Sequence, residues 1–106
     1  MLVIECLREV RVAGIDRTYD SLVKIARAHG VRRLILFGSR ARGDAFKKSD
    51  IDLAVEGCGD FAAFWEDVQE NLWSLLTVDI VNLDDEPSKA LLEDIRRDGK
   101  VLYEKV

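Results

Sequence analysis

A chain of 106 residues has room for one domain built around one hydrophobic core. Its composition, 48% hydrophobic and 34% charged with a single proline, is that of an ordinary globular protein and excludes a disordered, fibrous or disulfide-stapled chain. The formal net charge of -4 argues against nonspecific binding to nucleic acid or membrane surfaces. We therefore expect one domain over residues 1–106, with no direct nucleic-acid partner.

The apolar runs, cysteines and histidine of the chain argue against a membrane location, a disulfide or zinc site, and histidine-dependent catalysis. The longest apolar runs, Met1–Ile4 and Leu34–Phe37, are far too short to cross a bilayer or to serve as a signal peptide, so a cytoplasmic location is expected. Cys6 and Cys58 form no metal or disulfide pattern, so both are expected as reduced thiols. The single histidine, His29, is interpreted as a partner of a helix dipole, which nearly excludes histidine-dependent catalysis.

The first part of the chain predicts one clear helix. Residues 1–13 are treated as an N-terminal extension, because their apolar positions fit several structures, among them a short helix ended by Gly14. Asp16 is predicted as the N-cap of a helix that ends at Gly30. Its apolar positions recur at helical spacing: Tyr19, Leu22, Val23 and Ala26.

Two strands and a second helix are predicted next. Arg33–Phe37 is a short apolar strand stopped by Gly38, and Asp50–Glu56 is a strand with apolar residues at alternate positions. After a glycine-containing turn, Asp60 is the predicted cap of a helix. The apolar stripe of that helix is interpreted as core: Phe61, Phe64, Trp65, Val68 and Leu72.

The last third of the chain predicts a strand, a helix and a strand. Thr77–Leu83 is the third strand, and Lys100–Glu104 is the last. Between them, Asp85 and Pro87 open a helix that Gly99 ends, with its apolar positions facing inward: Leu91 and Ile95. The resulting order of elements predicts an α/β (α+β) fold, a small mixed β-sheet with helices packed on it.

Charge is distributed unevenly along the chain. Residues 31–49 carry six basic residues and one acid, whereas residues 50–106 carry 15 acids and five basic residues. A short basic loop therefore precedes an acidic region, which is the arrangement expected where an anion is held together with metal cations.

Three acidic residues occupy strand positions that aspartate ordinarily avoids. Asp50 and Asp52 are two residues apart, so their carboxylates project from one face, and Asp79 lies between two apolar residues of the third predicted strand. Singly, they are explained as a turn residue, a polar surface residue and a protective charge on an edge strand. Jointly, they predict a site for Mg²⁺ or Mn²⁺, because hard oxygen ligands suit these ions better than zinc.

A glycine-rich loop, Gly38–Gly43, follows the first strand directly. Its backbone N–H groups, the Ser39 hydroxyl and the guanidinium groups of Arg40 and Arg42 are suited to phosphate oxygens. It matches neither the Walker A loop nor the dinucleotide fingerprint. Alone, such a segment would more often be a solvated basic turn.

In combination these features resemble a known superfamily. Gly38-Ser39, ten residues, Asp50-Ile51-Asp52 and a later strand acid, Asp79, are similar to the pattern of the polymerase-beta-like nucleotidyltransferases. In detail, LILFGSRARGDAFKKSDIDLAV and LLEDIRRDGKVLYE resemble the minimal nucleotidyltransferase (MNT) subfamily of bacterial and archaeal two-gene modules. The resemblance covers about Asp16 to the C-terminus.

The resemblance implies a role for each matched residue. Asp50 and Asp52 would bind two Mg²⁺ ions, and Asp79 would hold the catalytic metal and orient or deprotonate the acceptor hydroxyl. The nucleoside triphosphate, ATP or another, would be held by the loop at Gly38, Ser39, Arg40 and Arg42. An acceptor oxygen would attack the α-phosphorus in line, and pyrophosphate would leave.

The resemblance also implies a partner. Larger family members have an acceptor-binding domain, which this chain is expected to lack, whereas members of the minimal subfamily pair with a helical HEPN toxin and act as its antitoxin, in some cases by adenylylating a toxin tyrosine. Two alternatives stay open. The chain neutralises its partner by contact alone, or it is an antibiotic nucleotidyltransferase that needs a homodimer to complete its pocket.

Overall fold

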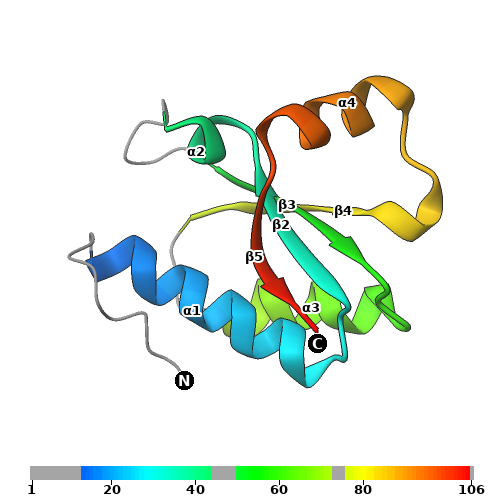
Figure 1. The fold of residues 1–106 in the computed structure, drawn as a ribbon. Coiled ribbons are helices and arrows are strands. Elements are labelled where there is room, and N and C mark those ends of the chain that lie inside the picture. Colours follow the sequence, from blue (N-terminus) through cyan, green and yellow to red (C-terminus); the bar gives the residue numbers. More distant parts are fainter. Residues whose placement is uncertain (1–12, 44–49, 73–75, 106) are drawn as a thin grey trace.

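The computed structural model describes residues 13–43, 50–72 and 76–105 of the chain. These ranges form a four-stranded mixed sheet with helices on both faces (Figure 1). In chain order, the elements are α1 (Ala13–Ala28), β2 (Arg33–Phe37), α2 (Ser39–Arg42), β3 (Ile51–Glu56), α3 (Phe61–Asn71), β4 (Val78–Asn82), the 3₁₀ turn η1 (Leu83–Asp85), α4 (Lys89–Asp98) and β5 (Lys100–Glu104).

The sheet combines antiparallel and parallel pairing. Its strand order is β4-β3-β2-β5, in which β2 pairs antiparallel with both β3 and β5, while β3 and β4 run parallel. The end of β2 therefore lies beside the beginnings of β3 and β4. The predicted α+β class with a small mixed sheet is confirmed.

One face of the sheet carries the main core. Side chains at alternate strand positions point to the same face, and those of Leu34, Leu53 and Val55 are fully buried against α1 and α3. From the helices, Leu22 and Phe64 are fully buried among them. In Figure 1, α1 and α3 lie together below the sheet.

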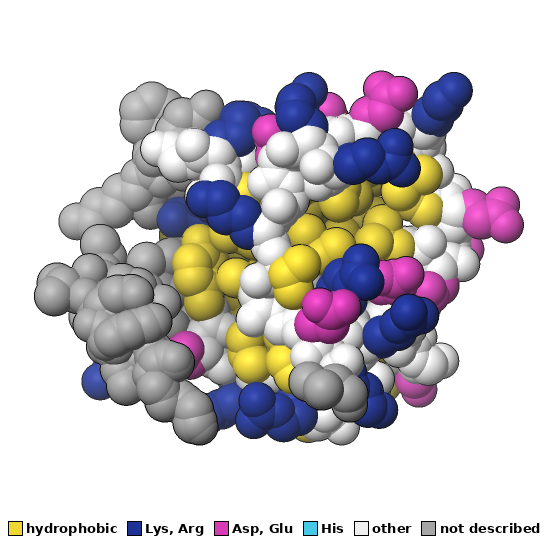
Figure 2. All heavy atoms as spheres, in the orientation of Figure 1, with side chains coloured by type: hydrophobic (Ala, Val, Ile, Leu, Met, Phe, Trp, Pro, Cys, Tyr) yellow, Lys and Arg dark blue, Asp and Glu magenta, His cyan; other side chains and the backbone are white. Residues whose placement is uncertain are grey.

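The opposite face is covered by α4 and is less completely buried. Ile35, Ala54 and Ile95 form a second cluster, with Val81 and Leu91 packed at its margin. Figure 2 shows apolar side chains at the surface on the side of the molecule that α4 and β5 present to the viewer. The helices thus enclose one face of the sheet, whereas α4 leaves part of the other face accessible.

Two predicted helix starts are wrong. The backbone of α1 is already helical at Ala13 and continues through Gly14 and Asp16, so Asp16 is not the N-cap. An interior glycine costs a helix only about 1 kcal/mol, which the packing of the rest of α1 can offset. The last helix is capped by Ser88, whose Oγ accepts from Leu91 N at 3.2 Å, because the segment predicted to open it at Asp85 forms η1 instead.

The aromatic stripe of α3 is only partly core. Asp60 caps the helix as predicted, with Oδ1 accepting from Ala63 N at 3.0 Å. Phe64 and Val68 are buried, but Trp65 is 46% exposed, so its assignment to the core is wrong. Trp65 lies one residue, or about 100°, around the helix from Phe64, beyond the face that contacts the sheet.

Candidate active site

The three predicted acids lie near one end of the sheet. Asp52, the second residue of β3, is half-buried and stands directly opposite Asp79 of β4 in the parallel register. Neighbouring strands are about 4.8 Å apart, and paired residues point to the same face. Asp50 is exposed and immediately precedes β3, two residues from Asp52. Asp50 therefore lies just outside the strand that was predicted to begin with it.

The electrostatics of Asp52 reflect this crowding. Burial raises the pKa of the Asp52 carboxyl, and the negative charges of Asp79 and Asp50 raise it further, while the positive charge of Arg42 lowers it. Both neighbouring carboxylates thus lie close enough to disfavour the ionised form of Asp52. A cation placed among the three would relieve that repulsion.

Gly38 allows the backbone to pass directly against Asp52. Its φ of 77° and ψ of -157° lie in a region that essentially only glycine occupies. A Cβ at this position would fall 2.4 Å from Oδ2 of Asp52. The glycine therefore brings the junction of β2 and α2 against the central carboxylate.

Backbone hydrogen bonds and the buried side chain of Ala41 hold the rest of the loop in place. In α2, the carbonyl of Gly38 accepts from the N–H groups of Ala41 and Arg42, and the Ala41 side chain is buried. Gly43 ends α2 in the left-handed conformation, and its N–H bonds to the carbonyl of Ser39 at 3.0 Å. Ser39 and Arg40 are partly exposed at the start of α2. The predicted phosphate-binding residues are therefore carried on the element adjoining Asp52.

The chemistry of the paired carboxylates Asp52 and Asp79 is compatible with a divalent ion that also takes ligands from a substrate. Within residues 13–43, 50–72 and 76–105, no three His, Cys, Asp or Glu side chains form a group that could hold an ion unaided. Mg²⁺, however, is commonly bound by one or two carboxylates together with substrate phosphates and water. Asp52 and Asp79 supply such carboxylates, and burial together with the charges of Asp79 and Asp50 raises the pKa of Asp52, so a nearby cation would stabilise its ionised form.

Sequence reasoning missed one residue beside this site. Nη1 of Arg42 donates to Oδ2 of Asp98, the last residue of α4, at 3.1 Å. The Asp98 side chain is only 8% exposed. An acid in the last turn of a helix opposes the helix dipole, and this unfavourable placement is the signal that could have pointed to Asp98.

His29 and Cys58 lie outside the site. Nε2 of His29 is 2.8 Å from Oδ2 of Asp67 on α3, and the ring packs edge-on against Phe64. His29 directly follows α1, at the helix end as predicted, and its side chain also connects this end to α3. Cys58 is a free, buried thiol whose pKa is raised by burial, which disfavours the reactive thiolate. Cys6 lies outside the described residues.

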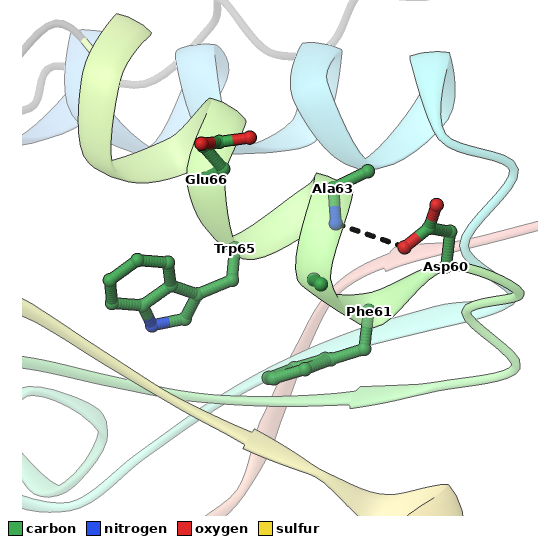
Figure 3. A pocket seen from close by; sticks show the side chains of 6 residues that line it. Asp60, Phe61, Ala63, Trp65 and Glu66 are labelled. Atoms are coloured by element: carbon green, nitrogen blue, oxygen red, sulfur yellow. Dashed lines mark hydrogen bonds between the residues drawn. The ribbon is translucent and has the colours of Figure 1, made fainter.

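A shallow pocket elsewhere on the surface is separate from the carboxylates. It lies over the first turns of α3 (Figure 3). The helix α3 packs on the face of the sheet opposite α4. Phe61 and Trp65 extend to the same side of α3 in this view. The residues that line it are Asp60, Phe61, Ala62, Ala63, Trp65 and Glu66. None of these belongs to the candidate active site.

A mixed sheet that presents carboxylates from two parallel neighbours beside a Gly-Ser loop is the architecture of a nucleotidyltransferase domain. Residues 20–106 match the family model "Polymerase beta, Nucleotidyltransferase". This match spans most of the chain, which therefore belongs to the polymerase beta nucleotidyltransferase family. The resemblance inferred from the sequence motifs is confirmed, and so is the fold.

Among solved structures, the chain is similar to minimal nucleotidyltransferases and to chains from toxin–antitoxin structures. A chain from a toxin–antitoxin structure with AMP-PNP is 30% identical, with a TM-score of 0.66, over 82% of this chain and 73% of that chain. A chain from the tri-AMPylated Shewanella oneidensis HEPN toxin in complex with MNT antitoxin is 27% identical, with a TM-score of 0.61, over 85% and 72% of the two chains. A minimal nucleotidyltransferase is 26% identical, with a TM-score of 0.64, over 88% and 97%.

Among curated proteins, none matches the chain significantly. Of the helices that the structure describes, none combines the length and the apolar character needed to cross a membrane.

Proposed function

We propose that this chain is a Mg²⁺-dependent nucleotidyltransferase that moves AMP from ATP to a hydroxyl group of a helical HEPN-type partner, and that it acts as the antitoxin of that partner. The observation that carries the proposal is the direct pairing of Asp52 with Asp79, with Asp50 two residues away and Gly38 against the Asp52 carboxylate. The likeness to chains from toxin–antitoxin structures, one with AMP-PNP and one with an AMPylated HEPN toxin, supports the choice of nucleotide and partner. The proposal treats residues 1–106 as one catalytic domain.

The carboxylates have separate tasks in this proposal. Asp50, Asp52 and Asp79 would hold two Mg²⁺ ions, with Mn²⁺ as a substitute, and these ions would neutralise the charge that develops on the entering and leaving oxygens. Asp79 is exposed, so its carboxylate is accessible to an acceptor hydroxyl, which it would orient or deprotonate. Asp52 is half-buried behind it and fixed in position by the strand pairing on both sides.

The loop at Gly38–Arg42 would bind the triphosphate of the nucleotide. Gly38 and Ser39 would hold the triphosphate close to Asp52, since the absence of a side chain at Gly38 lets the backbone approach the ligand. Arg40 and Arg42 would bind the phosphate oxygens by charge and by paired N–H donors. The in-line attack of the acceptor oxygen on the α-phosphorus would then release pyrophosphate into a positively charged loop.

Transfer of labelled AMP tests the proposal. The chain is purified with its neighbouring gene product and incubated with ATP labelled at the α-phosphate and Mg²⁺. Label should appear on the partner, and it should be absent with EDTA and with the double variant Asp50→Asn/Asp52→Asn. Asp85→Asn is the matched control, since Asp85 is an exposed acid of η1. Equal labelling by the double variant would overturn the proposal.

The same materials decide between the alternatives. A double variant that protects cells from the partner as well as the wild type does would show neutralisation by contact alone. Label on an antibiotic such as an aminoglycoside, in the absence of any partner protein, would assign the transfer to a small molecule.

A further inference from the structure

Asp98 is a buried acid in an unfavourable place. It is the last residue of α4, and its side chain is 8% exposed. The carbonyl groups at the end of a helix carry partial negative charge, so a carboxylate there is repelled where a basic residue would be attracted. A buried charge also loses hydration, and it is tolerated only where it is paired and hydrogen-bonded. Asp98 therefore depends on its partners.

Two arginines provide that compensation. Arg97, its neighbour in the chain, donates from Nε to Oδ1 at 3.1 Å and from Nη2 to Oδ2 at 3.0 Å. Arg42 donates from Nη1 to the same Oδ2 at 3.1 Å, although it is 56 residues away on α2. Arg97 is local to α4 and already neutralises the carboxylate. The bond to Arg42 thus links α4 to the loop of the candidate active site.

Arg42 is also coupled to the central carboxylate. Its positive charge acts on Asp52. The arginine thus bonds to the Asp98 carboxylate and lies near enough to Asp52 for its charge to act there. A long side chain in such a position has many rotamers, and fixing it costs up to about 2 kcal/mol of conformational entropy. The bond to Asp98, a buried side chain that Arg97 also holds, restricts the guanidinium before any ligand arrives.

We propose that Asp98 is a positioning residue, which holds the guanidinium of Arg42 in the orientation that binds the phosphates of the nucleoside triphosphate. This inference rests on the proposed function, and it names a role for a residue of α4 that lies outside the metal and phosphate ligands. It requires that the loss of Asp98 weaken the binding of a triphosphate more than the binding of a nucleotide with a single phosphate.

Nucleotide binding to the isolated chain provides the test. The probes are α,β-methylene-ATP with Mg²⁺, which cannot undergo the transfer, and AMP, both titrated by calorimetry. Asp98→Asn should weaken α,β-methylene-ATP about tenfold, equivalent to about 1.4 kcal/mol, and AMP by less than about twofold. Asp94→Asn is the matched control, because Asp94 also pairs with Arg97, at 3.2 Å, and its side chain is 54% exposed. It should bind both probes as the wild type does.

A double-mutant cycle separates positioning from a general effect on the fold. Combining Asp98→Asn with Arg42→Met should weaken α,β-methylene-ATP no more than Arg42→Met alone, because the acid acts through the arginine. Asp98→Glu, which keeps the charge, should recover part of the affinity. If Asp98→Asn does not fold, Asp98→Glu becomes the test variant and should weaken only α,β-methylene-ATP.

The outcomes distinguish this inference from the function on which it rests. Equal losses for α,β-methylene-ATP and AMP, or additive losses in the cycle, would overturn the role of Asp98 while leaving AMP transfer intact. A chain that shows the selective, non-additive loss but labels no acceptor would keep the role of Asp98 and remove the proposed transfer. Absence of α,β-methylene-ATP binding by the wild type would remove both.

Discussion

Replacing Gly38 with alanine perturbs the site by a single methyl group. The added Cβ would lie 2.4 Å from Oδ2 of Asp52, 3.2 Å from its Cγ and 3.3 Å from its Cβ. The contact is with the carboxylate and the base of a side chain fixed between two strands. Either Asp52 must rotate or the start of α2 must move away from β3.

The cost has two parts. Holding alanine at the φ of 77° and ψ of -157° seen at Gly38 costs about 1–3 kcal/mol. Forcing the Asp52 side chain away from its rotamer adds about 0.5–1.5 kcal/mol. The free energy of unfolding should therefore fall by about 1.5–4.5 kcal/mol. The rate of AMP transfer should fall by about 100-fold, since a displacement of 1 Å at a reacting site is enough for such a loss.

Gly30→Ala supplies the control. Gly30 also has a positive φ, 69°, but a Cβ there would meet nothing within 4 Å. This variant should lose about 1–2 kcal/mol of stability from the backbone conformation alone and should transfer AMP normally. Urea denaturation and labelled AMP transfer are measured for both variants. The reasoning is refuted if Gly38→Ala unfolds at the same urea concentration as Gly30→Ala and keeps its activity.

Three other predictions concern charge and packing. Asp52→Asn should raise the thermal midpoint of the metal-free protein while abolishing transfer, because the raised pKa of Asp52 means that its ionised form is disfavoured by folding. For the same reason Asp52 should make the metal-free wild type more stable as the pH falls through that raised pKa towards the ordinary value of 3.8. A variant midpoint at or below the wild-type value would contradict both expectations. Asp67→Asn should lower the thermal midpoint at neutral pH, because the hydrogen bond from His29 holds the pKa of Asp67 below its ordinary value of 3.8. The difference in midpoint from the wild type should shrink as the pH falls through the lowered pKa. A difference that stays constant with pH would show that the ionisation of Asp67 is not its cause. Phe64→Ala, at a fully buried position, should cost about 3–5 kcal/mol in urea denaturation, against less than about 1 kcal/mol for the exposed Trp65→Ala; equal costs would show that the core is placed wrongly.

The alternating pattern predicted correctly that Asp52 and Asp79 lie in strands, whereas Asp50 immediately precedes its strand. Alternation of apolar residues put Asp50 and Asp52 on one face of a strand, and the same alternation put Asp79 on the polar face of another. The alternating pattern does not predict which strands pair with each other or in which register. The parallel pairing that sets Asp52 opposite Asp79 depends on the crossover through α3, which is a property of the whole fold.

The partners of single side chains were harder to predict. The bond between Arg42 and Asp98 and the contact between His29 and Asp67 join residues 56 and 38 positions apart, so no local pattern contains them. Trp65 was misassigned for a related reason, because helical spacing gives the direction of a side chain but not the width of the face that the sheet covers. Local sequence rules were sufficient where the interacting residues lie within one helical turn, as for the N-cap at Asp60.

The claim on which the account depends is that Asp79 acts together with Asp52 in transferring AMP. The rate of labelled AMP transfer to the partner protein, measured in a single turnover for the wild type and for Asp79→Asn across a series of Mg²⁺ concentrations, tests it most directly. The account predicts that Asp79→Asn is slower than the wild type by at least about 100-fold at every Mg²⁺ concentration, the size of loss typical when a proton-transfer group is removed. A variant that matches the wild-type rate at saturating Mg²⁺ would contradict it.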